Sequence, residues 1–210
     1  MRDGGALLHA RFCRSPARDM ERAACACGGR IMNERMVKKE NNFAYIDGVN
    51  LHKAVSDLGW RLDYERFRVW LREKYHVEKA YLFIGLIPGF TDLYKYLQES
   101  GFILVYKEVV YDKKGKPKGN CDADLVLQVV SDTYENKFTK AIIVSSDGDY
   151  AGTVKFLQSR EKIVALLSPA KHEKCSILLK RTNVSISYIG DQRAILEAHR
   201  EKAPDGDGTQ

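Results

Sequence analysis

The chain has 210 residues, of which 44% are hydrophobic, and this is enough to bury one sizeable core. Its net charge of +6 is uneven, because residues 1–40 hold nine Arg and Lys against five Asp and Glu, whereas the other 170 residues carry 25 basic and 23 acidic side chains. The composition therefore permits an anionic partner such as nucleic acid without requiring one.

The five cysteines contain no CxxC pair, which argues against a zinc site and favours a reduced, cytoplasmic location. No apolar stretch approaches the roughly 18 residues of a membrane span, so we expect a soluble protein without a membrane partner.

Both ends of the chain are predicted to lie outside the folded domain. Residues 1–40 are rich in Arg, Ala, Gly and Cys with little apolar periodicity, which indicates a disordered or non-native N-terminal extension. Residues 201–210 are rich in Gly and Asp, which is typical of a disordered C-terminal end. Residues 41–200 then form the one predicted domain.

Within this domain, apolar runs of five to eight residues alternate with helical patterns, which predicts parallel strands joined by crossover helices. In chain order the predicted elements are strand Phe43–Val49, a helix from about Asp63, strand Lys79–Ile84, helix Asp92–Glu99, strand Ile103–Val110, a lysine-rich turn Asp112–Lys118, helix Ala123–Tyr134, strand Ala141–Ser145, helix Tyr150–Ser159, strand Ile163–Leu167, a short helix Ser176–Arg181, a weak strand Ser185–Ile189 and a last helix Gln192–Arg200. The predicted fold class is α/β, with three α/β/α layers around a central, mostly parallel sheet.

Three polar segments lie at the ends of predicted strands or at the start of a helix, where open parallel sheets bind ligands. Asp47–Asn50 follows the first strand, Ser145–Asp149 follows the fourth, and Lys118–Asp124 leads into the helix between them. Asp47 ends a strand that should be buried on both faces, where an unpaired charge is costly. If Asp147 lies at the matching end of a neighbouring strand, two or more carboxylates converge, and they must share protons or bind a cation.

Each acid also has a purely structural interpretation. An aspartate at a helix N-terminus accepts backbone hydrogen bonds worth about 0.5–2 kcal/mol, which individually explains Asp149 and either Asp122 or Asp124. Carboxylate and amide oxygens, however, also suit Mg²⁺ or Mn²⁺, which can acidify a water molecule and offset the charge of a phosphodiester. Asp122 and Asp124 are two residues apart and cannot face the same ion, so we expect Asp122 to point inward and Asp124 to have a supporting or capping role.

Taken together and in this order, the three segments resemble the motifs of the NYN domain, a branch of the PIN-like ribonuclease superfamily with a Rossmann-like fold. Tyr45–Asn50 is similar to the first motif of the family, an aspartate followed three residues later by asparagine. Lys118–Leu125 is similar to its Lys-Gly-x-x-Asp helix start, and Ile143–Tyr150 is similar to its Ser-x-Asp-x-Asp motif. The resemblance extends from about Phe43 to Ile189 and is closest to single-domain bacterial members.

The resemblance implies a metal-dependent endoribonuclease that hydrolyses RNA with a water activated by Mg²⁺ or Mn²⁺. It implies that the metal ligands are Asp47, Asp122 and Asp147. Asp149 would assist, Asn50 would help to position the metal or the scissile phosphate, and further support would come from Asp124, Ser145 and Ser146. Two positions depart from the family pattern, because Cys121 replaces an aliphatic residue and Asp124 replaces a frequent glutamate. We interpret Cys121 as a small buried hydrophobe rather than a nucleophile.

Two clusters of basic residues are weaker candidates for RNA contact. The first consists of Lys113, Lys114, Lys116 and Lys118 in the predicted turn, and a solvated turn explains it equally well. The second consists of Lys171, His172, Lys174, Lys180 and Arg181, which we interpret as solvated surface.

Alternative functions follow from the same residues. A catalytically inactive RNA-binding or protein-interaction module on this fold is the main one, because the presence of ligands does not establish turnover. The sequence has no GxxxxGKS/T motif, so no nucleotide cofactor is expected at a P-loop. An Asp-x-Asp phosphatase is disfavoured, because its motif would follow the first strand rather than a late one. The identity of the RNA and the formation of a homo-oligomer stay open.

Overall fold

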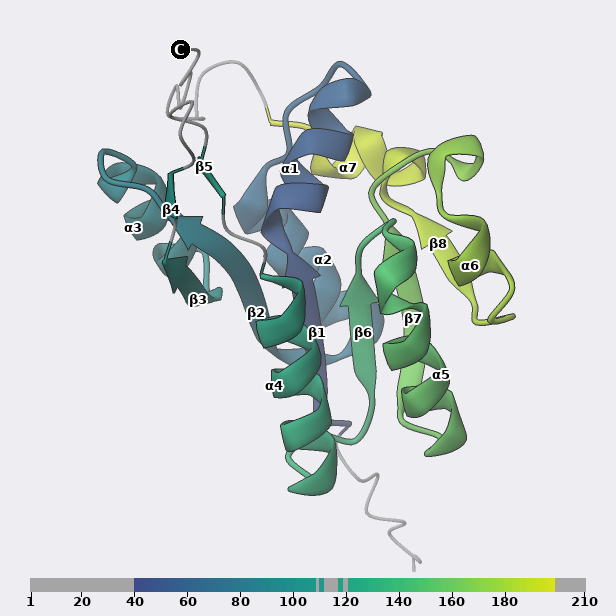
Figure 1. Cartoon of the computed structure of the whole chain (residues 1–210). Helices are drawn as coiled ribbons and strands as arrows, with labels where there is room; N and C mark the ends of the chain where they lie inside the picture. The colour runs from purple at the N-terminus through teal and green to yellow at the C-terminus, as the bar shows by residue number, and fades with distance from the viewer. Residues whose placement is uncertain (1–39, 109, 112–116, 119–120, 199–210) are drawn as a thin grey trace, which may run out of the picture. The chain divides into compact units, whose positions relative to one another are not determined.

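Six parallel strands form the central sheet of the computed structural model, which describes residues 40–108, 110–111, 117–118 and 121–198 (Figure 1). The strands are β1 (Asn42–Asp47), β2 (Val77–Leu86), β3 (Ile103–Glu108), β6 (Ala141–Val144), β7 (Ile163–Ser168) and β8 (Ile186–Tyr188). Their spatial order is β3-β2-β1-β6-β7-β8, and every neighbouring pair in this sheet is parallel. A separate antiparallel pair is formed by β4 (Val110–Tyr111) and β5 (Pro117–Lys118).

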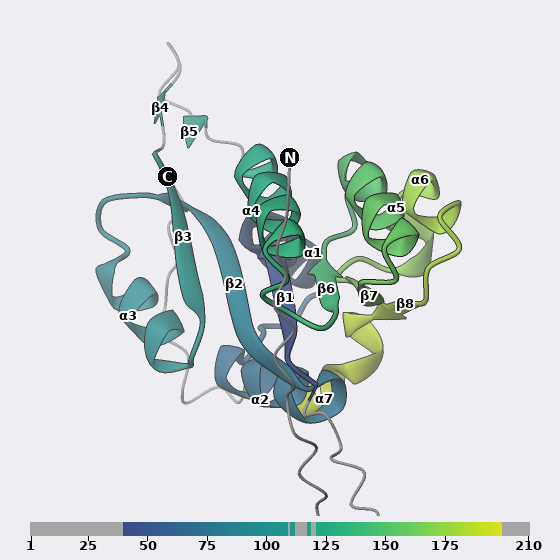
Figure 2. The ribbon, with the colours of Figure 1, turned by 90° about the horizontal axis from the view of Figure 1, so that it is seen from below.

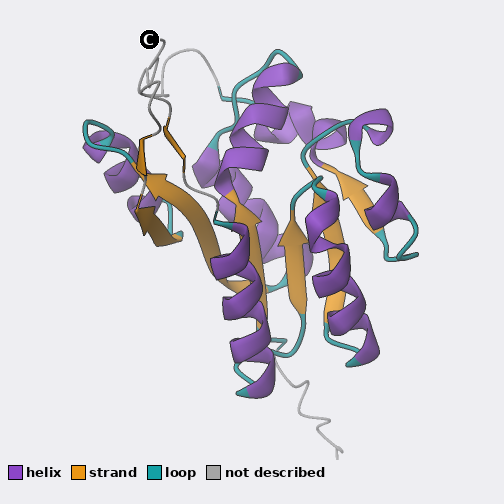
Figure 3. Ribbon diagram, in the orientation of Figure 1, coloured by secondary structure: helices purple, strands orange, loops and turns teal. Residues whose placement is uncertain are grey.

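Helices cover both faces of the sheet (Figures 2 and 3). One face packs against α1 (Gly48–Asp57), α2 (Tyr64–Tyr75), α3 (Thr91–Glu99) and α7 (Arg193–Leu196). The other face packs against α4 (Asp122–Tyr134), α5 (Ala151–Ser159) and α6 (Ile177–Lys180). Short 3₁₀ segments are η1 (Gly148–Tyr150), η2 (His172–Lys174) and η3 (Ile189–Gln192). The predicted three-layer α/β/α class is confirmed.

Strand β1 shows why the sheet lies in the middle of the molecule. All six of its residues are buried. Because side chains alternate along a strand, Ala44 and Ile46 enter the core on one face while Phe43 and Tyr45 enter the core on the other. Each large side chain buried in this way contributes on the order of 1.5–3 kcal/mol. A continuous apolar run is therefore the expected sequence of a central parallel strand.

The strand order places a topological switch point at the carboxyl ends of β1 and β6. From β1 the chain proceeds outward to β2 and β3 and then returns to β6 on the opposite side of β1. Ile46 pairs with Val144, so the two strands end at the same level. Connections that leave in opposite directions from adjacent strands open a gap between them, which is the usual ligand site of such sheets.

Helix α1 was not predicted, and the predicted strand Phe43–Val49 is wrong in its last two residues. Asp47 ends the strand and accepts a hydrogen bond from the backbone N–H of Asn50, which caps the new helix. Leu51 and Val55 lie one helical turn apart and are both buried. At Gly48 a Cβ atom would lie 2.8 Å from the carbonyl oxygen of Phe83, so the chain can turn this close to β2 only with glycine.

The remaining differences concern the ends of elements. Strand β2 is longer than the predicted Lys79–Ile84. The last helix is shorter than the predicted Gln192–Arg200, because Glu197 has left the helix and forms an isolated antiparallel bridge with Leu62. The predicted segment Ile103–Val110 is divided between β3 and β4. Other predicted ends are shifted by one or two residues.

Some predictions fall beyond the described residues. The N-terminal extension at 1–40, apart from Glu40, and the C-terminal end at 201–210 are not among them. Within the described ranges, no helix combines the length and the apolar character that crossing a membrane requires.

Candidate active site

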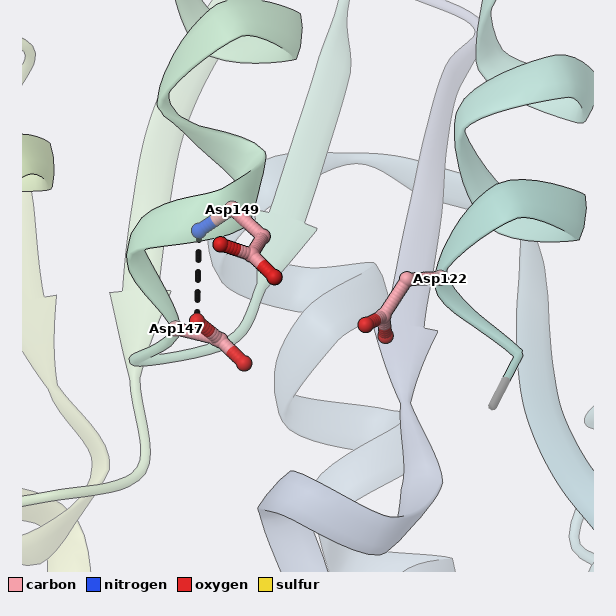
Figure 4. Close-up of side chains that lie close together, drawn as sticks. All are labelled: Asp122, Asp147 and Asp149. Carbon is pink, nitrogen blue, oxygen red and sulfur yellow. Dashed lines mark hydrogen bonds between the residues drawn. The ribbon is translucent and has the colours of Figure 1, made fainter. Parts of the chain in front are cut away.

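Three carboxylates converge beyond the ends of β1 and β6. Asp122 belongs to the first turn of α4, whereas Asp147 and Asp149 come from the segment that joins β6 to α5. One carboxylate oxygen of each lies within 4.8 Å of the others, and the three side chains point toward one another in Figure 4. Asp122 and Asp147 are half-buried and Asp149 is exposed. Like charges at this separation repel, and hard oxygen donors open to water fit the coordination of a divalent cation such as Mg²⁺ or Mn²⁺.

The segment after β6 is tightly held. Asp147 precedes η1, and its Oδ1 accepts a hydrogen bond of 3.2 Å from the backbone N–H of Asp149. Its own N–H donates to Ser145 Oγ at 3.1 Å. A Cβ atom at position 148 would collide with the Ser176 hydroxyl, so this position must be glycine for α6 to pack against η1. These contacts bring the carboxylates of Asp147 and Asp149 close to that of Asp122.

Asp47 lies behind this trio of carboxylates rather than within it. It is 7% exposed, and besides capping α1 its Oδ2 lies 3.3 Å from the Tyr150 hydroxyl. Burial raises the pKa of the Asp47 carboxyl, and the charges of Asp122 and Asp147 raise it further, while the hydrogen bonds from Asn50 and Tyr150 oppose the shift. The three acids that lie within 4.8 Å of one another thus include Asp149 and not Asp47, and the predicted ligand set of Asp47, Asp122 and Asp147 stays a prediction.

Tyr150 was missed by the sequence analysis. Its buried hydroxyl donates to Asp122 Oδ1 and also lies close to Asp47, so it links two acids from separate elements. Burial, the hydrogen bond to Asp122 and the charge of Asp47 all raise the pKa of this hydroxyl, which keeps it protonated. The only signal in the sequence was its place directly after the third motif, where a core aromatic is equally expected.

Asn50 connects α1 to the segment after β6. Its Oδ1 accepts hydrogen bonds of 2.9 Å from both the backbone N–H and the hydroxyl of Ser146. The amide nitrogen donates to none of the described residues, so its two N–H groups are available to a ligand. Ser146 is in turn 9% exposed, which makes this a mostly buried link.

Asp124 and Cys121 lie at the start of α4 but outside the trio. Asp124 forms an ion pair with Lys107 of β3 at 2.8 Å. Cys121 occupies the N-cap position of α4 and is buried, and burial together with the neighbouring carboxylates raises the pKa of its thiol to about 11. It is a neutral hydrophobe, in agreement with the sequence interpretation. Asp47 and Asp147 are the N-caps that accept backbone hydrogen bonds, whereas Asp122, Asp124 and Asp149 lie in first turns, where a negative charge suits the helix dipole.

The predicted lysine-rich turn gives no further information on the site. Lys113, Lys114 and Lys116 lie outside the described residues, and only the backbone of Lys118 is described, as part of β5.

Comparison with known proteins assigns the chain to a family. The model of the NYN domain matches residues 43–188, which is more than half of the chain. The chain belongs to the NYN domain family. This NYN domain carries all three motifs from which the resemblance was predicted. NYN domains are part of the PIN-like nuclease superfamily and are generally nucleases, which supports a hydrolase role for this one.

A solved structure supports the fold of this NYN domain. The crystal structure of a protein of unknown function from Vibrio parahaemolyticus, VPA0982, is similar over 75% of this chain and 96% of its own, with a TM-score of 0.63 and 22% identity. At this identity the likeness concerns the fold alone. A comparison with curated proteins found no match.

Proposed function

We propose that this NYN domain is a metal-dependent endoribonuclease that hydrolyses phosphodiester bonds of RNA in the cytoplasm. The observation that carries the proposal is the convergence of Asp122, Asp147 and Asp149 from two separate elements at the switch point between β1 and β6. Capping and first-turn positions account for each acid singly, whereas a bound divalent cation would offset the mutual repulsion of all three together. A cation held there could in turn receive a phosphodiester.

The three carboxylates would hold Mg²⁺ or Mn²⁺, and Asp47 would add negative charge from behind. When bound, such an ion supplies acidification of water and compensation of phosphate charge. The residues of the chain orient the participants. Tyr150 holds the Asp122 carboxylate by its hydrogen bond, and Asn50, whose amide oxygen is occupied by Ser146, has its N–H donors available to the RNA backbone.

The test is cleavage of a circular, fluorescently labelled RNA by the purified chain, because a circular substrate is opened only by an endonuclease. We expect cleavage with Mg²⁺ or Mn²⁺, none in EDTA, and losses of at least about 100-fold in Asp122→Asn and Asp147→Asn, since even residues that only support metal ligands cost 10–100-fold. Glu161→Gln is the matched control, because Glu161 is exposed just before β7 and thus at the opposite edge of the sheet.

Cleavage that survives both EDTA and Asp147→Asn would disprove the mechanism. Binding of RNA without cleavage under any metal condition would instead support the inactive RNA-binding module. A DNA circle of the same sequence tests the choice of RNA over DNA.

A further inference from the structure

A basic pocket of about 250 Å³ adjoins the carboxylate trio on the side of α1. It lies between α1 and the segment that connects β7 to α6. The polar and charged residues that line it are Asn50, Lys53, Asp57, Ser146, Lys171 and Lys174. Ser146 directly precedes Asp147 and is bonded to Asn50, so the pocket and the trio share a wall.

The charge of this basic pocket favours an anion. Three lysines against one aspartate leave a formal charge of +2. The aspartate neutralises little of it, because Lys174 Nζ lies 3.6 Å from Asp57 Oδ2 and these side chains are 66% and 50% exposed. Neither Lys53 nor Lys171 forms an ion pair with any residue that the structure describes. Two ammonium groups are thus available from residues that line the pocket.

The hydrogen-bonding groups of the pocket also favour an anion. The carbonyl oxygen of the Asn50 amide is turned toward Ser146, where it accepts two hydrogen bonds. This orientation leaves the amide N–H groups as donors, and lysine ammonium groups are donors only. A phosphate has several acceptor oxygens and a negative charge, so it complements this set of donors.

The tertiary structure changes the interpretation of these lysines. In the sequence Lys171 and Lys174 belong to a basic stretch that a solvated surface explains. Lys53 comes from the predicted strand-to-helix region far away in the chain. Folding brings all three around one pocket that Ser146 links to the carboxylate trio, so a positive and a negative region lie next to each other at the carboxyl edge of the sheet. A nucleic acid strand presents phosphates in succession, and a metal and lysines can receive different ones.

We propose that the basic pocket binds a phosphate of the RNA next to the scissile phosphodiester, with Lys53 and Lys171 as the main charged contacts and the Asn50 amide as a neutral one. The identity of the ligand rests on the proposed function. The phosphate is either an internal diester or a terminal monophosphate, and the two sources are distinguished below.

The experiment measures binding rather than cleavage. Fluorescence anisotropy with labelled single-stranded RNA is recorded on the full chain in EDTA over a series of salt concentrations. Lys53→Ala and Lys171→Ala should each weaken binding roughly threefold to tenfold and lower the slope of log affinity against log salt by about one. Lys171→Arg should retain most of the affinity. Lys140→Ala and Lys155→Ala are the matched controls, because both lysines are exposed, one at the opposite edge of the sheet and one on α5.

RNA with a 5′-monophosphate and the same RNA with a 5′-hydroxyl are compared to identify the source. A larger effect of the lysine variants on the phosphorylated RNA assigns the pocket to a terminal phosphate. An equal effect on both assigns it to an internal one. Competition by inorganic phosphate that disappears in Lys53→Ala supports either form.

The outcomes separate this inference from the proposed function. If the chain binds RNA through Lys53 and Lys171 but never cleaves it, the function fails and the phosphate pocket stands. If the chain cleaves RNA and both alanine variants bind like the controls, the pocket is wrong and the function stands. Absence of RNA binding by the unmodified chain at low salt also overturns the inference.

Discussion

The hydroxyl of Tyr150 donates a hydrogen bond to the carboxylate of Asp122, and this contact joins the segment after β6 to the first turn of α4. The same hydroxyl lies 3.3 Å from Asp47. One neutral donor therefore stands between two acids from different elements. Its hydrogen bonds allow the carboxylates of Asp47 and Asp122 to lie close to each other despite their like charge.

Tyr150→Phe is expected to reduce both RNA cleavage and the affinity for Mn²⁺ about 10–100-fold, because it releases the Asp122 carboxylate while keeping the ring in the core. Activity assays and calorimetric titration with Mn²⁺ measure the two effects. The matched control is Tyr45→Phe, which removes a buried hydroxyl that donates to Asp132 at 2.9 Å in the same core. The control should lose stability by about 1–3 kcal/mol without losing Mn²⁺ affinity. Equal Mn²⁺ affinity in both variants would contradict a role for Tyr150 in positioning Asp122.

The identity of the third ligand is tested by thermal unfolding with and without Mn²⁺. A ligand that binds only the folded state stabilises it by about 2.7 kcal/mol at 100 times its dissociation constant, so Mn²⁺ should raise the Tm of the chain. Asp149→Asn should abolish most of this rise, whereas Asp47→Asn should retain more of it, because Asp149 is in the trio and Asp47 is behind it. Asp124→Asn serves as the control, since Asp124 pairs with Lys107. If Asp47→Asn lost more of the Mn²⁺-induced rise in Tm than Asp149→Asn, the ligand set Asp47, Asp122 and Asp147 predicted from the motifs would be supported instead.

Without metal, Asp47→Asn is expected to be more stable than the parent chain at neutral pH. The folded-state pKa of Asp47 is raised above its unfolded value of about 3.9, chiefly by burial. A raised pKa means that folding favours the protonated form, so the stability associated with it is complete below the unfolded pKa and is lost as pH rises through the folded pKa. Asparagine is neutral at every pH and keeps an oxygen to cap α1. Chemical denaturation in EDTA from pH 3 to pH 8 should show that the free energy of unfolding of the variant, relative to that of the parent, increases as pH rises. A difference that does not change with pH would rule out this account.

Gly148→Ala should destabilise the fold by about 1–3 kcal/mol and lower activity, because its Cβ atom would collide with the Ser176 hydroxyl and displace Asp147 or α6. Adding Ser176→Gly should recover part of both losses by removing the atoms in conflict. Gly152→Ala is the comparison, since nothing lies within 4 Å of its Cβ position in α5, and it should stabilise the helix by about 0.5–1 kcal/mol. Denaturant unfolding and cleavage assays measure these effects. Loss of stability without loss of cleavage would show that the close packing at Gly148 does not position the acids.

The order of strands and helices was predictable because each element carries its own local pattern. Apolar runs such as Ala141–Val144 identify strands that are buried on both faces, and Asp147 follows one of them in a motif of the family. Helix α1 was not predictable in this way, because apolar Val49 continues the pattern of β1 and the residue that ends the strand, Asp47, does so through a side-chain hydrogen bond.

The carboxylate motifs show which features of the site are determined by the sequence alone and which depend on the tertiary structure. By itself the sequence determined the α/β class, the family and the acids that collect at the carboxyl edge, since strand ends and motif spacing are local properties. Only the tertiary structure decided that Asp149 joins Asp122 and Asp147, that Tyr150 lies between Asp122 and Asp47, and that Lys53 shares a pocket with Lys171. The physical reason is that side-chain directions after a 3₁₀ turn, and contacts between residues far apart in the chain, depend on how the layers pack rather than on any local pattern.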